Sequence, residues 1–238
     1  MKRTFLYILA ALLAASCKNS SVQNNKSEGD KPVITVTIEP LRYFTEAIAG
    51  DNFNVISMVP KGSSPETYDP TPQQLVDLAK SKAYFRIGYI GFEQTWMDKL
   101  TDNAPHLQFF DTSRGIDLIY DSSHAHHHHD ADEPHAHDSI QDDEHQHLLG
   151  VEPHVWSSAY NAQIIAGNIV NALCAIDKGN EEVYMERYKS LCNQIEHTDS
   201  LICHMLSAPN ADRAFMIYHP ALSYFARDYG LHLSLIHI

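Results

Sequence analysis

Short β-branched segments alternate with helical segments over residues 33–110, and this alternation constrains the fold more than any other feature. Residues 33–38 read Val-Ile-Thr-Val-Thr-Ile, which is typical of a strand buried on both faces. The same patterns predict further strands at 53–59, 83–87 and 107–110, and helices at 41–49, 73–80 and 92–100. Strands separated by helices indicate an α/β fold with a mostly parallel sheet covered on both faces.

The segments between these elements indicate where a ligand binds. Thr71 is a good N-cap residue, and Pro72 is suited to the first helical position that follows it. Glu93 is expected in the first turn of its helix, where an acidic side chain is favoured. Ligands of parallel sheets bind beyond the carboxyl ends of the strands, so the loop 61–69 is the expected place for a site.

Two longer helices follow, at 157–176 and 181–206. The second would be about 39 Å long at 1.5 Å per residue, which suits a stiff connection between two lobes. A strand at 214–218 and a helix at 221–229 come next, but a lone strand and helix cannot bury their apolar faces. We therefore expect an incomplete second lobe, and the sequence leaves open whether the tail 233–238 is native. The helix at 181–206 is predicted from an apolar stripe that comprises Tyr184, Tyr188, Leu191, Ile195, Thr198, Ile202 and Met205.

An internal segment concentrates histidines among carboxylates. It holds nine of the sixteen histidines of the chain. Imidazole is a preferred ligand of zinc, and a segment with few apolar residues cannot form a core, so we interpret 121–149 as a disordered loop that binds metal weakly. An expression tag is the alternative, although tags are usually terminal and unbroken. The histidines are His124, His126, His127, His128, His129, His135, His137, His145 and His147.

The amino terminus predicts export. A basic start, an apolar stretch at 5–15 that is too short to span a bilayer, and small residues before Cys17 form a signal peptide over residues 1–17. This arrangement resembles a bacterial lipoprotein signal, in which Cys17 is lipidated and residues 18–31 act as a flexible tether to the membrane. Ordinary cleavage, with the cysteine incidental, is the alternative.

The charge of the chain favours cations as ligands. The formal net charge is −13, and removal of Lys2 and Arg3 with the signal takes it to −15. A negative charge of this size argues against binding to nucleic acid.

Three motifs resemble one protein family. They are Ser-Pro-Glu-Thr-Tyr-Asp-Pro-Thr-Pro at 64–72, Glu-Pro-His-Val-Trp at 152–156, and Tyr-His-Pro-Ala at 218–221 followed by Tyr-Phe-Ala-Arg-Asp-Tyr-Gly-Leu at 224–231. Together they resemble the zinc- and manganese-binding solute-binding proteins of bacterial ABC importers. The resemblance implies two α/β lobes joined by one long helix, with the metal held in the cleft between them. The histidine loop resembles that of the zinc members, so Zn²⁺ is the first expectation and Mn²⁺ the alternative.

The resemblance also implies a ligand set. His154 and His219 fall on metal ligands of the family, although a single histidine is more often a structural residue. Glu66 stands where the family usually has histidine; a carboxylate can bind zinc, or a water or a loop histidine can take its place. The fourth ligand of the family lies beyond Ile238, so the site is expected to be incomplete.

The implied organisation places a lobe at 32–156, a helical segment with the linker helix at 157–206, and the start of a truncated second lobe at 207–238. The implied function is high-affinity capture of zinc outside the cytoplasm, in the periplasm or at the cell surface. The partners would be the permease and ATPase of a metal importer, and the protein would be a monomer. A manganese-specific protein and a surface adhesin or metal-storage lipoprotein remain alternatives. A zinc hydrolase is disfavoured because the sequence lacks a His-Glu-x-x-His motif, so no enzyme is expected.

Overall fold

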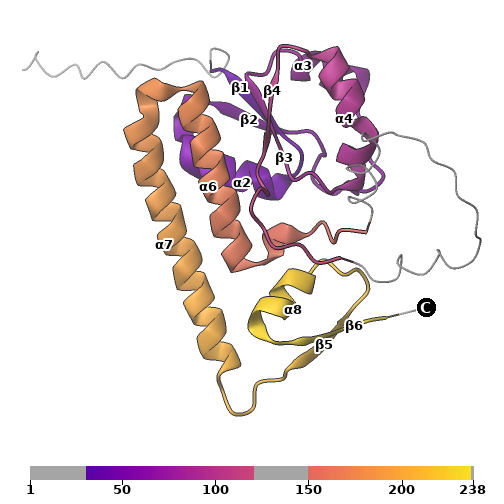
Figure 1. The fold of residues 1–238 in the computed structure, drawn as a ribbon, viewed down its shortest axis with the longest axis vertical. Helices are drawn as coiled ribbons and strands as arrows, with labels where there is room; N and C mark the ends of the chain where they lie inside the picture. The colour runs from indigo at the N-terminus through magenta and orange to yellow at the C-terminus, as the bar shows by residue number, and fades with distance from the viewer. Residues whose placement is uncertain (1–30, 121–149, 237–238) are drawn as a thin grey trace, which may run out of the picture. The chain divides into compact units, whose positions relative to one another are not determined.

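The computed structural model describes residues 31–120 and 150–236, so the predicted signal, most of the predicted tether and the histidine-rich loop lie outside the described residues (Figure 1). The strands are β1 (Val33–Val36), β2 (Asn54–Ser57), β3 (Ala83–Arg86), β4 (Gln108–Asp111), β5 (Ala214–Ile217) and β6 (His232–Leu235). The α-helices are α2 (Glu39–Ala49), α3 (Pro72–Leu78), α4 (Gly91–Asn103), α6 (Ala159–Ile176), α7 (Glu181–Leu206) and α8 (Ser223–Tyr229). Single 3₁₀ turns are η2 (Gly50–Asn52), η4 (Val155–Ser157) and η5 (Lys178–Asn180).

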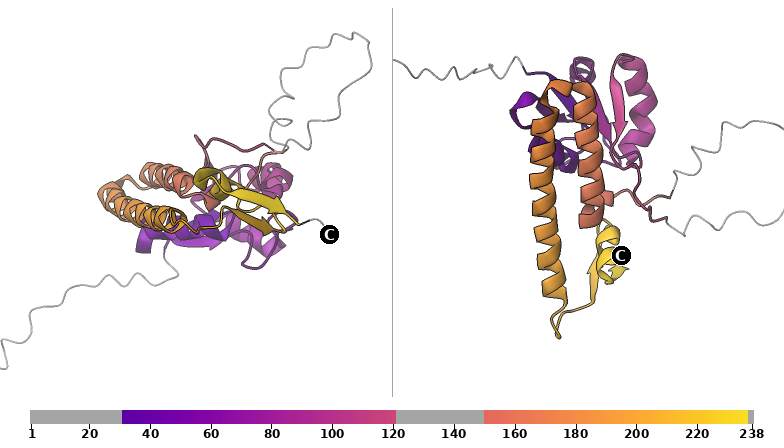
Figure 2. Two further views of the ribbon diagram at one scale, coloured as in Figure 1. Left: turned by 90° about the horizontal axis from the view of Figure 1, so that it is seen from below. Right: turned by 60° about the vertical axis from the view of Figure 1, so that its left-hand side comes forward.

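The first four strands form one parallel sheet in the order β2-β1-β3-β4. Helices α2, α6 and α7 lie on one side of this sheet, and α3 and α4 lie on the other (Figures 1 and 2). The α/β prediction is therefore confirmed, with strand and helix bounds within a few residues of those expected. The order of the strands reverses between β1 and β3, and in such sheets a binding crevice forms beyond the carboxyl ends of the strands at this point.

Helix α3 begins where its sequence predicts. The Thr71 hydroxyl accepts a hydrogen bond from the Gln74 N–H at 3.3 Å, and the Gln74 side chain accepts one from the Thr71 N–H at 2.9 Å. This reciprocal capping box, with Pro72 as the first helical residue, satisfies backbone donors that the helix itself cannot pair.

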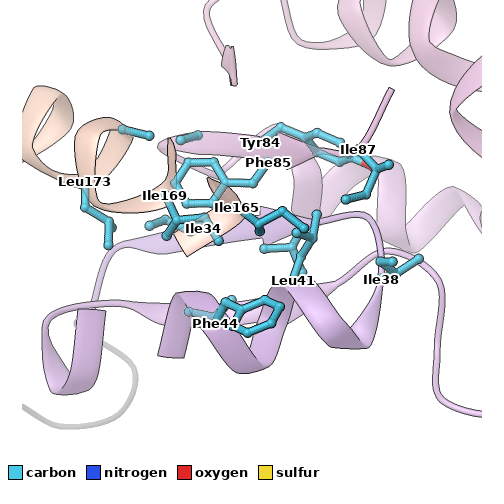
Figure 3. Packing of buried hydrophobic residues seen from close by; sticks show 14 of the residues in the cluster. Ile34, Ile38, Leu41, Phe44, Tyr84, Phe85, Ile87, Ile165, Ile169 and Leu173 are labelled. Atoms are coloured by element: carbon cyan, nitrogen blue, oxygen red, sulfur yellow. The ribbon is translucent and has the colours of Figure 1, made fainter. Parts of the chain in front are cut away.

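The core lies between the sheet and helices α2 and α6 (Figure 3). Ile34 of β1 and Phe85 of β3 pack with Leu41 of α2 and with Ile165 and Ile169 of α6, and all five are fully buried. Figure 3 shows the α6 side chains reaching the sheet beside those of α2. The face of α6 that carries Ile165 and Ile169 thus joins the core of the first sheet.

Two long helices lie side by side on that face. Within the part of the chain that the structure describes, α6 alone reaches the length and mean hydropathy of a membrane span, with 18 residues and a value of 1.2, but its apolar side packs on the sheet. The stripe of α7 is buried only in its first half, at Tyr184 and Leu191. Near the end of α7, Met205 is 71% exposed. The first half of α7 therefore packs on the core, and its second half extends beyond the core, as expected of a helix that connects two lobes.

The second sheet contains β5 and β6, which pair in parallel and are linked by α8. The strand β5 and helix α8 match the prediction, whereas β6 was not predicted, because a four-residue strand next to an ambiguous tail gives little periodicity. Gly230 ends α8 in the left-handed conformation, at a φ of 62°, which glycine adopts without strain. This strand-helix-strand unit carries His219 in the connection between β5 and α8.

Candidate metal centre

Two imidazoles distant in sequence meet in the fold. The Nε2 atoms of His154 and His219 lie 2.9 Å apart, and the rings are nearly perpendicular, at 84°. Two imidazoles on one tetrahedral zinc ion, each at 2.0–2.1 Å, would have their nitrogens about 3.3 Å apart. The observed spacing is close to this value, so small shifts of the two rings would let both nitrogens bind the same ion.

The two rings differ in exposure and support. His154 is 6% exposed and immediately precedes η4. The Trp156 ring packs edge-on against His154 with ring centres 5.1 Å apart. His219 is exposed and follows β5. The pair therefore consists of one rigidly surrounded donor from the segment before η4 and one accessible donor from the connection between β5 and α8.

Glu152 orients the buried imidazole. One carboxylate oxygen of Glu152 contacts Nδ1 of His154 and also accepts a hydrogen bond from the His154 backbone N–H at 3.1 Å. A carboxylate at Nδ1 favours the tautomer with its proton on that nitrogen, which leaves the Nε2 lone pair directed at His219 for a metal. Glu152 belongs to the predicted Glu-Pro-His-Val-Trp motif, but no role was predicted for it; its position two residues before a candidate ligand was the signal in the sequence.

The backbone around His154 is fixed by the start of α6. The Ser158 hydroxyl caps this helix by accepting a hydrogen bond from the Asn161 N–H at 3.1 Å. The Asn161 side chain in turn donates to the Val155 carbonyl at 3.1 Å. Because Val155 and Asn161 are fully buried, the turn that follows His154 is held against the core.

Glu66 lies in the loop between β2 and α3, as predicted, but it is engaged elsewhere. Its Oε2 atom accepts a hydrogen bond from the Gly91 N–H at 3.0 Å, at the N-terminus of α4, where a carboxylate is favoured. A Cβ at position 91 would lie 2.7 Å from both the carbonyl oxygen and Oε2 of Glu66, so this contact depends on glycine. Among residues 31–120 and 150–236, no group of three or more His, Cys, Asp or Glu side chains is placed to hold a metal. The structure thus brings His154 and His219 together without Glu66.

Three other histidines of the described residues are exposed and are not part of this pair. His106 is exposed and its Nε2 contacts the Ala79 carbonyl at 2.9 Å. His197 and His204 are exposed on α7. The loop histidines and Cys17 lie outside the described residues.

Comparison with known proteins supports the reading of the motifs. Residues 34–238 match the family described as "ZnuA: Zinc-uptake complex component A periplasmic". The chain belongs to this family. It is therefore a substrate-binding protein of the metal ABC importer type, as the motifs predicted, and the family is one of transport proteins.

Relatives of this ZnuA-family chain are named for different metals. It is 29% identical to the high-affinity zinc uptake system protein ZnuA of Bacillus subtilis (strain 168), with 95% of this chain and 68% of that protein covered. It is 26% identical to the manganese ABC transporter substrate-binding lipoprotein PsaA of Streptococcus anginosus, with 95% and 67% covered. The chain thus spans about two thirds of the length of these relatives.

Solved structures confirm the fold. A crystal structure of ZnuA matches with a TM-score of 0.73 and 30% identity, covering 88% of this chain and 71% of that one. A zinc-bound deletion mutant of ZnuA matches with a TM-score of 0.72 and 31% identity, covering 87% and 70%. The α/β architecture with a parallel sheet and a long helix is therefore that of the ZnuA family.

Proposed function

We propose that this protein captures zinc outside the cytoplasm and delivers it to the permease of an ABC importer, with no catalytic turnover. The observation that carries the proposal is the pair of imidazole nitrogens 2.9 Å apart, one from the segment before η4 and one from the connection between β5 and α8. A site shared between two parts of a protein can bind metal when they approach and release it when they separate. Neutral imidazoles suit this task because they bind zinc without the permanence of a thiolate site.

The rest of the predicted arrangement belongs to the same proposal. Glu66 would become a further ligand if its carboxylate left the Gly91 N–H, a rearrangement within a loop. Cys17 would carry the lipid, residues 18–31 would form the tether, and the protein would work as a monomer at the membrane surface. In the helical segment 157–206, α6 and the start of α7 would stay with the lobe at 32–156, and the second lobe from 207 would move relative to them at the end of α7. The word "lipoprotein" in the name of the manganese relative supports the membrane address.

Zinc is proposed over manganese because of the donors present. Nitrogen ligands favour zinc, whereas manganese prefers oxygen ligands and stands lower in the affinity order of divalent metals. We expect the purified protein to bind Zn²⁺ on the order of 100-fold more tightly than Mn²⁺. Competition titrations with a chelator of known affinity would measure both constants. Equal affinities, or a preference for Mn²⁺ or Fe²⁺, would overturn the assignment of zinc while leaving the family intact.

The histidine-rich segment is proposed as a weak collector that passes zinc to the central pair. Deleting 121–149 is expected to remove several weak binding events seen by calorimetry and to leave the tightest event nearly unchanged. The reason is that a segment with so few apolar residues is expected not to hold its histidines in a preformed geometry, and so to bind metal weakly. If the deletion left the number of bound zinc ions unchanged, the segment would have no collecting role.

A further inference from the structure

The buried hydroxyl of Tyr224 joins helix α8 to the chain that leads to His154. An antiparallel bridge pairs Tyr120 with Val151, and next to it the Glu152 N–H donates to the Ile119 carbonyl at 2.9 Å. The reciprocal groups of that pair, the Ile119 N–H and the Glu152 carbonyl, both bond to the Tyr224 hydroxyl, at 3.1 and 2.8 Å. The phenol of Tyr224 on α8 is therefore inserted between the backbone segments 119–120 and 151–152.

This hydroxyl is well suited to a fixed position. Tyr224 is fully buried, and it uses its proton to donate to one partner and its oxygen to accept from the other. Burial raises the pKa of the Tyr224 phenol to about 12, so the hydroxyl keeps its proton at neutral pH. The Ile119 N–H and the Glu152 carbonyl belong to half-buried residues, and both lose a hydrogen-bond partner if α8 moves away.

Tyr224 is connected to both members of the imidazole pair. The Glu152 carbonyl that it binds belongs to the residue whose carboxylate orients His154. On the other side, Tyr224 lies five residues after His219, and the intervening turn is closed by a hydrogen bond from the Ser223 hydroxyl to the Pro220 carbonyl at 2.8 Å. One side chain therefore connects the two segments that carry the two metal-binding nitrogens.

We propose that Tyr224 is a positioning residue that sets the distance between the His154 and His219 nitrogens, and so the affinity and geometry of metal binding. The proposal rests on the zinc-binding function of that pair. It assigns the buried hydroxyl of α8 a role in binding that goes beyond packing of the helix.

The same helix supplies a matched control. The Tyr229 hydroxyl donates to the Asp199 carboxylate of α7 at 2.6 Å, a contact that involves neither histidine segment. Tyr224→Phe and Tyr229→Phe each remove one hydroxyl from α8. We expect Tyr224→Phe to weaken zinc binding about tenfold, which is the lower end of the effect of losing an outer partner of a metal ligand. Tyr229→Phe should leave the zinc affinity within about twofold of the wild-type value. Chelator competition gives the affinities, and thermal unfolding of the metal-free proteins shows how much each change affects stability.

Two further readouts separate positioning from stability. Co²⁺ in place of zinc reports geometry through its visible absorption, and the Tyr224→Phe spectrum should lose intensity relative to both wild type and Tyr229→Phe. In a His154→Ala background, Tyr224→Phe should cause no further loss of zinc affinity, because the group that it positions is gone. If wild type bound no zinc, the proposed function itself would fail. If wild type bound zinc and the two tyrosine variants behaved alike, only the role of Tyr224 would be refuted.

Discussion

Replacement of either central histidine is expected to lower zinc affinity by more than about 100-fold, because losing an outer-shell partner alone already costs 10–100-fold. His219→Ala is the cleaner variant, since this ring is exposed and its removal leaves the core intact. His154→Ala removes a ring that is 6% exposed and leaves the Glu152 carboxylate without its imidazole partner, so it should also lower the thermal stability of the metal-free protein. Zinc content after dialysis and chelator competition would measure both effects.

The matched control for the histidine variants is His106→Ala. This imidazole is also exposed and contacts only a backbone carbonyl of the described residues, that of Ala79. We expect unchanged tight binding in this variant. A loss of affinity shared equally by His106→Ala and His219→Ala would mean that histidines contribute through general attraction of metal, and the central pair would lose its special role. The histidine-rich segment is the same in all of these proteins, so its weak binding cancels in the comparison.

Replacement of Glu93 by alanine is expected to destabilise the protein by about 3 kcal/mol, because it leaves three donors without an acceptor and each unpaired buried group costs about 1–3 kcal/mol. The carboxylate is 1% exposed and lies beyond the carboxyl ends of β1 and β3. It accepts hydrogen bonds from the Thr37 hydroxyl, from the Ile87 N–H at 2.9 Å and from the Gly88 N–H. Urea unfolding of the metal-free protein would measure the loss of unfolding free energy. The dependence of that free energy on urea concentration should be the same in wild type and variant.

Glu46→Ala is the control for this prediction. Glu46 is also a glutamate on a helix, but its carboxylate is half exposed and pairs with Arg42 at 2.8 Å on the surface. Such pairs contribute about 0.2–1 kcal/mol, so its loss should be small. Comparable destabilisation by the two variants would show that the buried hydrogen bonds of Glu93 contribute no more than a surface ion pair.

The stability contributed by Glu93 should also depend on pH in a direction set by its burial. Burial raises the pKa of the Glu93 carboxyl above its ordinary value of 4.5, so the folded protein holds this proton more tightly than the unfolded chain. Stability from this group is therefore fully present below the ordinary pKa and is lost as pH rises through the raised folded value. Glu93→Gln cannot titrate, and the difference in unfolding free energy between wild type and this variant should follow that slope. A difference independent of pH across the window would contradict the raised pKa.

The sequence alone was sufficient for the order and type of the main elements. β-branched runs such as residues 33–38 can be buried only as strands inside a sheet, and the apolar stripe of 181–206 fits only a long helix. These patterns are local, because each depends on the period with which side chains face one side of an element. The strand β6 escaped prediction since four residues show too little of that period.

The sequence also determined which histidines to consider, through motifs that the family match supports. Only the tertiary structure decided how they are arranged. A spacing of 2.9 Å between nitrogens 65 residues apart in sequence depends on how α8 packs against the segment before η4, and no local pattern encodes such packing. The surroundings of Glu93 were also decided by the fold, because the sequence indicated only a first helical turn and the structure buries the side chain in the core. Likewise, only the structure shows that Glu66 accepts a hydrogen bond from the Gly91 N–H. Local periodicity fixes which face of an element is apolar, whereas the partners of a polar side chain are chosen by long-range packing.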